Sequence, residues 1–172
     1  MSKCFICGSF YDYEYPYIGY RKLYELFYDF VLKHRIDTVY SCHRNAFDDI
    51  MEQICNSVKN NWSVKLIYVY EDGLISPPNG FVPYSISESI SPLPSSPSLD
   101  TLYTSFYNWM IEQSEYMFTN IADDSDISQF VLQKAKQKGL KIFNIYDELP
   151  HKPEEFDMEW INGCVTNTAI FR

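Results

Sequence analysis

The stretch that decides the fold reads Asp37-Thr38-Val39-Tyr40-Ser41-Cys42-His43-Arg44-Asn45-Ala46-Phe47-Asp48. Its β-branched Thr38 and Val39 belong to an apolar run that is typical of a buried strand. A polar turn follows this run, and from Ala46 onward apolar residues recur at helical spacing. Parallel α/β sheets hold their ligands at the carboxyl ends of their strands, so this turn is a candidate binding element.

Strand and helix patterns alternate along the rest of the chain. The patterns predict strands over Lys3–Cys7, Asp37–Tyr40, Val64–Tyr70, Tyr116–Thr119 and Lys141–Ile145. They predict helices over about 18–34, 46–61, 100–113 and 127–138. Asp100 is the expected N-cap of the third helix, and Gly139 is expected to end the last one. The alternation predicts an α/β, three-layer Rossmann-like fold with a mainly parallel sheet of about five strands.

The 172 residues fit one domain, 1–172, with one interruption and one irregular end. A Pro/Ser-rich insertion occupies about 71–99 and holds most of the prolines. A connection of this length is either functional or disordered. We interpret it as an ordered cover over the sheet edge or the site, because its first half carries apolar residues such as Leu74 and Phe81. From about 147 the C-terminal tail is irregular, and only 156–160 has some helical character.

Charge and composition exclude several classes of partner. The net charge of −9 and a pI near 4.7 make non-specific nucleic-acid binding an unlikely role. No apolar run approaches the ~20 residues that span a bilayer, and no signal peptide is visible. The pair Cys4-x-x-Cys7 lies inside a predicted strand, so we expect buried free thiols on opposite faces and a reduced, cytoplasmic location. Aromatic residues make up 17% of the chain, which suits an interface in a homo-oligomer.

Three polar turns should meet at one edge of the sheet: Gly8-Ser9, 41–45 and 120–126. Helix starts attract anions through unpaired N–H groups, and Arg44 and His43 are the cations best placed to add to this attraction. The same residues also suit an ordinary surface loop. Asn45 followed by Asp48 equally fits a helix N-cap with an acidic first turn, which needs no ligand.

The acidic run in the third turn has two interpretations. Its carboxylates belong to Asp123, Asp124 and Asp126. Such a run binds Mg²⁺ in some proteins, but more often it caps the next helix. We therefore predict no metal, no cofactor and no catalytic residue.

These turns resemble motifs of the SLOG superfamily, the Rossmann-like nucleotide-sensing domains that include YpsA-like and DprA-like proteins. Cys7-Gly8-Ser9 is similar to the glycine-containing turn that opens YpsA-like members, and the segment 109–115 is similar to the aromatic-Met-aliphatic-acidic motif before their fourth strand. The frame 41–48 keeps three positions of a further motif: Ser41, Phe47 and Asp48. It departs from that motif where glycines are usual, at Cys42, His43 and Ala46. Residues 123–126 replace the Gly-Gly-Thr type turn.

The resemblance implies a non-enzymatic domain that binds or senses a nucleotide or a nucleotide derivative. The residues that it implies for the ligand site are Gly8, Ser9, Ser41, His43, Arg44, Asp48, Thr119 and Asn120. Two alternatives stay open. One is a protein-interaction module that has lost its small-molecule site, which the tyrosine-rich composition and missing glycines favour. The other is an N-glycosidase or deoxyribosyltransferase-like enzyme, in which Glu112 or Asp48 would supply the carboxylate.

Overall fold

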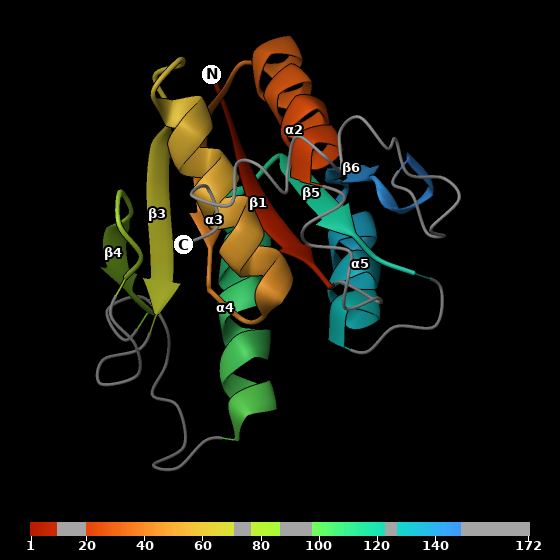
Figure 1. The fold of residues 1–172 in the computed structure, drawn as a ribbon. Helices are drawn as coiled ribbons and strands as arrows, with labels where there is room; N and C mark the ends of the chain where they lie inside the picture. Colours follow the sequence, from red (N-terminus) through yellow and green to blue (C-terminus); the bar gives the residue numbers. More distant parts are fainter. Residues whose placement is uncertain (10–19, 71–76, 87–97, 123–126, 149–172) are drawn as a thin grey trace.

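The structure, a computed structural model, describes residues 1–9, 20–70, 77–86, 98–122 and 127–148 (Figure 1). A six-stranded sheet forms the middle layer, in the order β4-β3-β2-β1-β5-β6, and every neighbouring pair is parallel. Its strands are β1 Ser2–Gly8, β2 Ile36–Ser41, β3 Lys65–Tyr70, β4 Val82–Ser85, β5 Tyr116–Asn120 and β6 Lys141–Asn144. The prediction of a three-layer Rossmann-like α/β fold is confirmed.

Two helices cover each face of the sheet (Figure 1). One face packs against α2 (Tyr20–His34) and α3 (Ala46–Lys59), and the other against α4 (Leu99–Gln113) and α5 (Ile127–Lys138). A short 3₁₀ turn, Tyr146–Glu148, follows β6. Alternate residues of β1 enter the two cores, so Cys4 lies in one hydrophobic cluster and Cys7 in the other. The predicted placement of these two buried free thiols on opposite faces is confirmed.

The prediction of about five strands is corrected to six, because the Pro/Ser-rich insertion contributes β4. This edge strand pairs with β3 and contains Pro83. Proline lacks a backbone donor and is accepted in a strand almost only at a sheet edge, so the sequence pattern hid this strand. Residues 71–76 and 87–97 of the insertion lie outside the described residues.

The N-cap of α4 is also corrected, from Asp100 to Ser98. Ser98 has extended backbone angles, and its hydroxyl accepts a hydrogen bond from the Thr101 N–H at 3.2 Å. Asp100 instead lies in the first turn, where its charge favours the helix dipole. Gly139 has a φ of +85° directly after α5, which confirms its predicted role in ending that helix.

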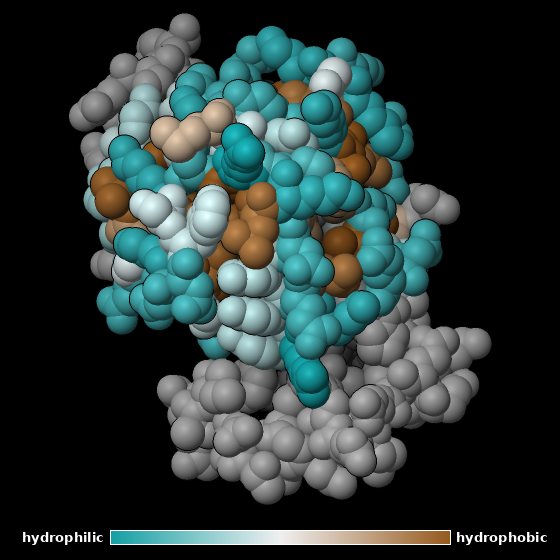
Figure 2. Space-filling view, turned by 90° about the horizontal axis from the view of Figure 1, so that it is seen from above, coloured by the Kyte–Doolittle hydropathy of each residue, from teal (hydrophilic) through white to brown (hydrophobic). Residues whose placement is uncertain are grey.

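Several expectations fall outside the described residues: the helix start near 18, the acidic run 123–126, and the tail beyond 148 with its 156–160 segment. None of the helices in the described part combines the length and apolar character needed to cross a membrane. Figure 2 looks onto the edge where the strands begin, and hydrophilic residues cover most of that face, with smaller hydrophobic patches between them. The candidate site lies at the opposite edge.

Candidate functional site

The carboxyl ends of β2, β1 and β5 lie side by side because β1 pairs with both other strands. From β1, the strands β2, β3 and β4 follow one another toward one edge of the sheet, whereas β5 and β6 follow one another toward the other edge. The order therefore reverses between β1 and β5. In open α/β sheets this reversal point is where ligands bind, because the connecting loops leave the strand ends in opposite directions.

Gly8 and Ser9 at the end of β1 are locked to Asn120 at the end of β5. The Ser9 N–H donates to the Asn120 carbonyl at 3.1 Å, and the Asn120 side-chain amide donates to the Ser9 carbonyl at 2.8 Å. A Cβ on Gly8 would lie 2.8 Å from both the backbone N and the backbone O of Asn120. This close approach of two strands accounts for the glycine by packing alone.

Arg44 leaves the turn after β2 and crosses the end of β1. Its Nη2 donates to the Gly8 carbonyl at 2.9 Å, to Ser9 Oγ at 3.2 Å and to Ser128 Oγ at 2.7 Å. The guanidinium carbon lies 5.8 Å from the centre of the Tyr107 ring. Ser128 belongs to the first turn of α5, so the cation bridges the end of β1 and the start of the helix that follows β5.

Asn45 caps α3 and ties the cap to β1. Its Oδ1 accepts from the backbone N–H groups of Phe47 and Asp48 at 3.0 and 3.3 Å. Its Nδ2 donates to the Gly8 carbonyl at 2.8 Å. The N-cap interpretation of Asn45 is therefore confirmed, and the same side chain also helps to fix the first turn of the site.

Asp48 is a buried carboxyl group, with 1% of the residue exposed. Its Oδ2 accepts from the backbone N–H of Arg44, while its Oδ1 has no hydrogen-bond partner among the described residues. Burial raises the pKa of Asp48 to about 7, against the lowering effect of the Arg44 hydrogen bond and charge. Near neutral pH this group can therefore either accept or donate a proton.

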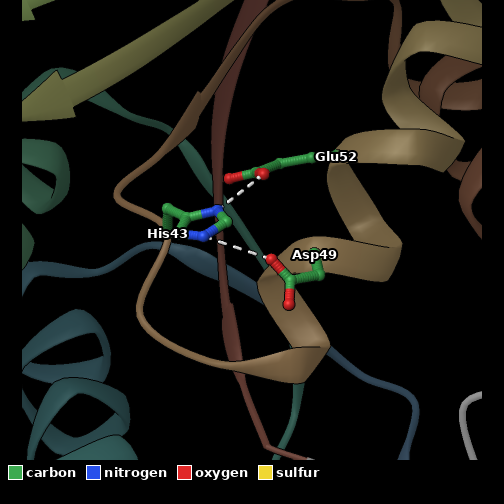
Figure 3. Close-up of side chains that lie close together, drawn as sticks. All are labelled: His43, Asp49 and Glu52. Atoms are coloured by element: carbon green, nitrogen blue, oxygen red, sulfur yellow. Dashed lines mark hydrogen bonds and ion pairs between the residues drawn. The ribbon is translucent and has the colours of Figure 1, made fainter. Parts of the chain in front are cut away.

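His43 points toward α3 (Figure 3), whereas Arg44 contacts the end of β1. Its Nδ1 lies 2.9 Å from Glu52 Oε2, and its Nε2 lies 3.2 Å from Asp49 Oδ1. The buried Ser41 hydroxyl donates to Glu52 Oε1 at 2.9 Å. Burial by itself lowers the pKa of His43, but the Glu52 hydrogen bond and the nearby carboxylate charges outweigh it and raise that pKa. We call His43, Asp49 and Glu52 the histidine cluster.

The predicted site residues thus divide into three groups. The first group lies at the reversal point and consists of Gly8, Ser9, Arg44 and Asn120. Asp48 adjoins it by accepting a hydrogen bond from the Arg44 backbone N–H. His43 belongs to the histidine cluster instead, and Ser41 contacts that cluster through Glu52. Thr119 is fully buried and donates its hydroxyl hydrogen to the Cys7 carbonyl.

Sequence reasoning missed several contributors to these groups: Tyr107, Ser128, Asp49 and Glu52. Glu52 carried a signal, because it is a charged residue between apolar Met51 and Ile54 on an amphipathic helix and is 4% exposed. Ser128 carried none, since a serine at a helix start is ordinary.

Neither a protein-family model nor a curated protein matches the sequence. The chemistry of the site therefore rests on its own residues. At the reversal point the Arg44 guanidinium group and the partly exposed Ser9 hydroxyl can contact an anion. Two buried side-chain oxygens without donors in the described part of the chain, Asp48 Oδ1 and Asn120 Oδ1, can accept hydrogen bonds.

Proposed function

We propose that the protein binds a nucleotide or a nucleotide derivative at the carboxyl ends of β1, β2 and β5, without chemically converting it. The observation that carries this proposal is the position of Arg44 at the reversal point, where its Nη2 contacts Ser9 and Ser128. In a chain of net charge −9, a cation held partly buried at this point is suited to an anionic ligand. Arginine also matches the planar geometry of phosphate oxygens.

The phosphate end of the ligand would lie against Arg44 and the start of α5. The partly exposed Ser9 hydroxyl lies 3.2 Å from the guanidinium, so it is able to donate to an oxygen bound beside it, while the buried Ser128 hydroxyl holds the guanidinium in place. The first backbone N–H groups of α5 add the positive end of the helix dipole. This arrangement would replace the glycine-rich backbone contacts that the sequence of the second turn lacks.

The rest of the ligand would need hydrogen-bond donors. Asp48 Oδ1 and Asn120 Oδ1 are buried acceptors, and no donor reaches either atom from the described residues. A buried polar atom left unsatisfied costs roughly 1–3 kcal/mol, so a ligand hydroxyl or amino group that reached it would gain affinity. A nucleotide has both a phosphate group and several such donors.

Isothermal titration calorimetry tests the proposal with a panel of nucleoside mono-, di- and triphosphates and dinucleotides. We expect at least one member to bind, and Arg44→Ala to weaken that binding at least tenfold. Arg21→Ala is the matched control, because Arg21 is exposed on α2 and pairs only with its neighbour Glu25 among the described residues. Arg44→Lys keeps the charge and separates a loss of contact geometry from misfolding. No heat from any member of the panel, with folded protein, would contradict the proposal.

A second candidate function is hydrolysis or transfer at an N-glycosidic bond, which Asp48 favours. Its raised pKa suits a carboxyl group that exchanges a proton near neutral pH. The other candidate, Glu112, is 2.6 Å from Lys138 near the end of α4, at the edge where the strands begin. Incubation with nucleosides and nucleotides, followed by chromatography for free base, tests this function. Base release that disappears in Asp48→Asn would favour it, and no release from any substrate removes it.

A further inference from the structure

The histidine cluster brings three metal-binding side chains to one point at the start of α3 (Figure 3). One ligand atom from each of His43, Asp49 and Glu52 lies within 4.8 Å of the others. Ligands held at roughly 2.0–2.2 Å from a tetrahedral Zn²⁺ ion lie about 3.4 Å apart. Glu52 contacts Nδ1 of His43 at 2.9 Å, whereas Asp49 contacts Nε2 at 3.2 Å, so one carboxylate has to move toward the nitrogen that ligates the ion. Asp49 is exposed, so its side chain can turn toward the nitrogen that faces Glu52 and complete a set of three ligand atoms around one ion.

The local fold supports these side chains. Asp49 and Glu52 are three residues apart on α3, so they share a helix face. The Ser41 hydroxyl donates to Glu52 Oε1, which leaves Oε2 directed at the imidazole. A hydrogen-bond donor behind a ligating carboxylate is the usual outer support of a metal site. His43 itself is held in the left-handed region, at φ +53°, by the turn between β2 and α3.

A second observation is a further carboxyl group that interacts with His43, that of Asp48. Asp48 lies four residues before Glu52, so its buried carboxyl group lies on the same side of α3. No hydrogen bond from the described residues reaches its Oδ1. The charges of three carboxyl groups, those of Asp48, Asp49 and Glu52, thus act on one imidazole. The Arg44 guanidinium donates hydrogen bonds to Gly8, Ser9 and Ser128, and its charge also acts on Asp48.

We propose that His43, Asp49 and Glu52 bind one divalent transition-metal ion of the Zn²⁺ type. One nitrogen with two carboxylate oxygens fits Zn²⁺, whereas Mg²⁺ and Ca²⁺ prefer oxygen ligands alone. Three protein ligands leave the fourth tetrahedral position open to water. Only one ring nitrogen can ligate the ion, so one of the two His43 contacts opens when the metal enters. The metal binds the neutral imidazole, so a protonated ring releases its proton to the solvent.

Metal titration of the full chain, stripped with EDTA, tests this proposal directly. We expect calorimetry with Zn²⁺ to give one equivalent bound, and Co²⁺ to give a visible absorption band from a site of low coordination number. His43→Asn and Asp49→Asn should each weaken Zn²⁺ binding at least tenfold. Asparagine suits position 43 because it tolerates positive φ better than other residues, and Asp49 is exposed, so both variants should fold.

Glu25→Gln is the matched control, since it removes an exposed carboxylate on α2 that is far along the chain from the cluster. It should leave Zn²⁺ affinity within twofold of the unmodified protein. Because other histidines and cysteines also bind Zn²⁺, stoichiometric binding that persists in both His43→Asn and Asp49→Asn would overturn the proposal. Absence of any Zn²⁺ binding by the folded protein would overturn it as well. Neither outcome bears on nucleotide binding, which depends on Arg44.

Discussion

Gly8→Ala is the sharpest test of what holds the site together. The added methyl group would meet the backbone N and O of Asn120 at 2.8 Å and a ring carbon of Phe47 at 3.0 Å. Overpacking a core costs typically 1–3 kcal/mol, and the upper end applies here because the obstructing atoms belong to a paired strand. We expect a loss of about 3 kcal/mol. At about 2–4 °C per kcal/mol for a chain of this size, the Tm should fall by about 6–12 °C.

Urea denaturation and thermal melting measure this loss, and Gly139→Ala is its control. Gly139 has open space around its missing Cβ but a φ of +85°, so alanine there meets only the left-handed backbone penalty of roughly 1–2 kcal/mol. Gly8→Ala should therefore be the more damaging variant. A Gly8→Ala protein as stable as the unmodified chain, yet unable to bind nucleotide, would refute the packing account. It would assign the glycine to close ligand approach instead.

The remaining predictions concern a helix cap and a buried carboxyl group. Ser98→Ala should destabilise the protein by about 1 kcal/mol in urea, whereas Asp100→Ala should cost less than half as much, because Ser98 Oγ caps α4. Asp48→Asn in EDTA-treated protein should gain stability relative to the unmodified chain as the pH rises from about 4 to about 7. The pKa of Asp48 is higher in the folded than in the unfolded state, so ionisation of Asp48 lowers the free energy of unfolding. The loss is ~4 kcal/mol at most, when the group is fully ionised. A stability difference that stays constant between pH 4.5 and pH 8 would contradict this assignment.

Sequence patterns predicted most of the fold because most strands and helices form where the local apolar spacing favours them. The β-branched run at Thr38 and Val39 formed β2, the helical stripe after Ala46 formed α3, and α5 has the predicted bounds of Ile127–Lys138. The missed strand was set by tertiary context. β4 exists because β3 offers it an edge, a partner that no local window of the Pro/Ser-rich segment can reveal.

The candidate site was predictable only in part, for a related reason. Strand order brought the Gly8 and Asn120 turns together, as the parallel fold requires. Side-chain direction was not predictable, because adjacent residues in a turn have no fixed periodicity. Only the backbone conformation at position 43, with its positive φ, places His43 against α3 while Arg44 crosses to β1.

Because Arg44 and His43 point in different directions, the proposed nucleotide and metal sites can be tested separately. Arg44→Ala should abolish nucleotide binding and leave Zn²⁺ affinity within a few-fold, because the guanidinium contacts Ser9 and Ser128 rather than the histidine cluster. His43→Asn should do the reverse. Among the described residues, Asp48 links the two groups, because it accepts from the Arg44 backbone N–H and lies on the same face of α3 as Glu52. If each variant lost both ligands while remaining folded, the two groups would form one site, coupled through Asp48. Nucleotide and metal should then enhance each other's affinity by the same factor.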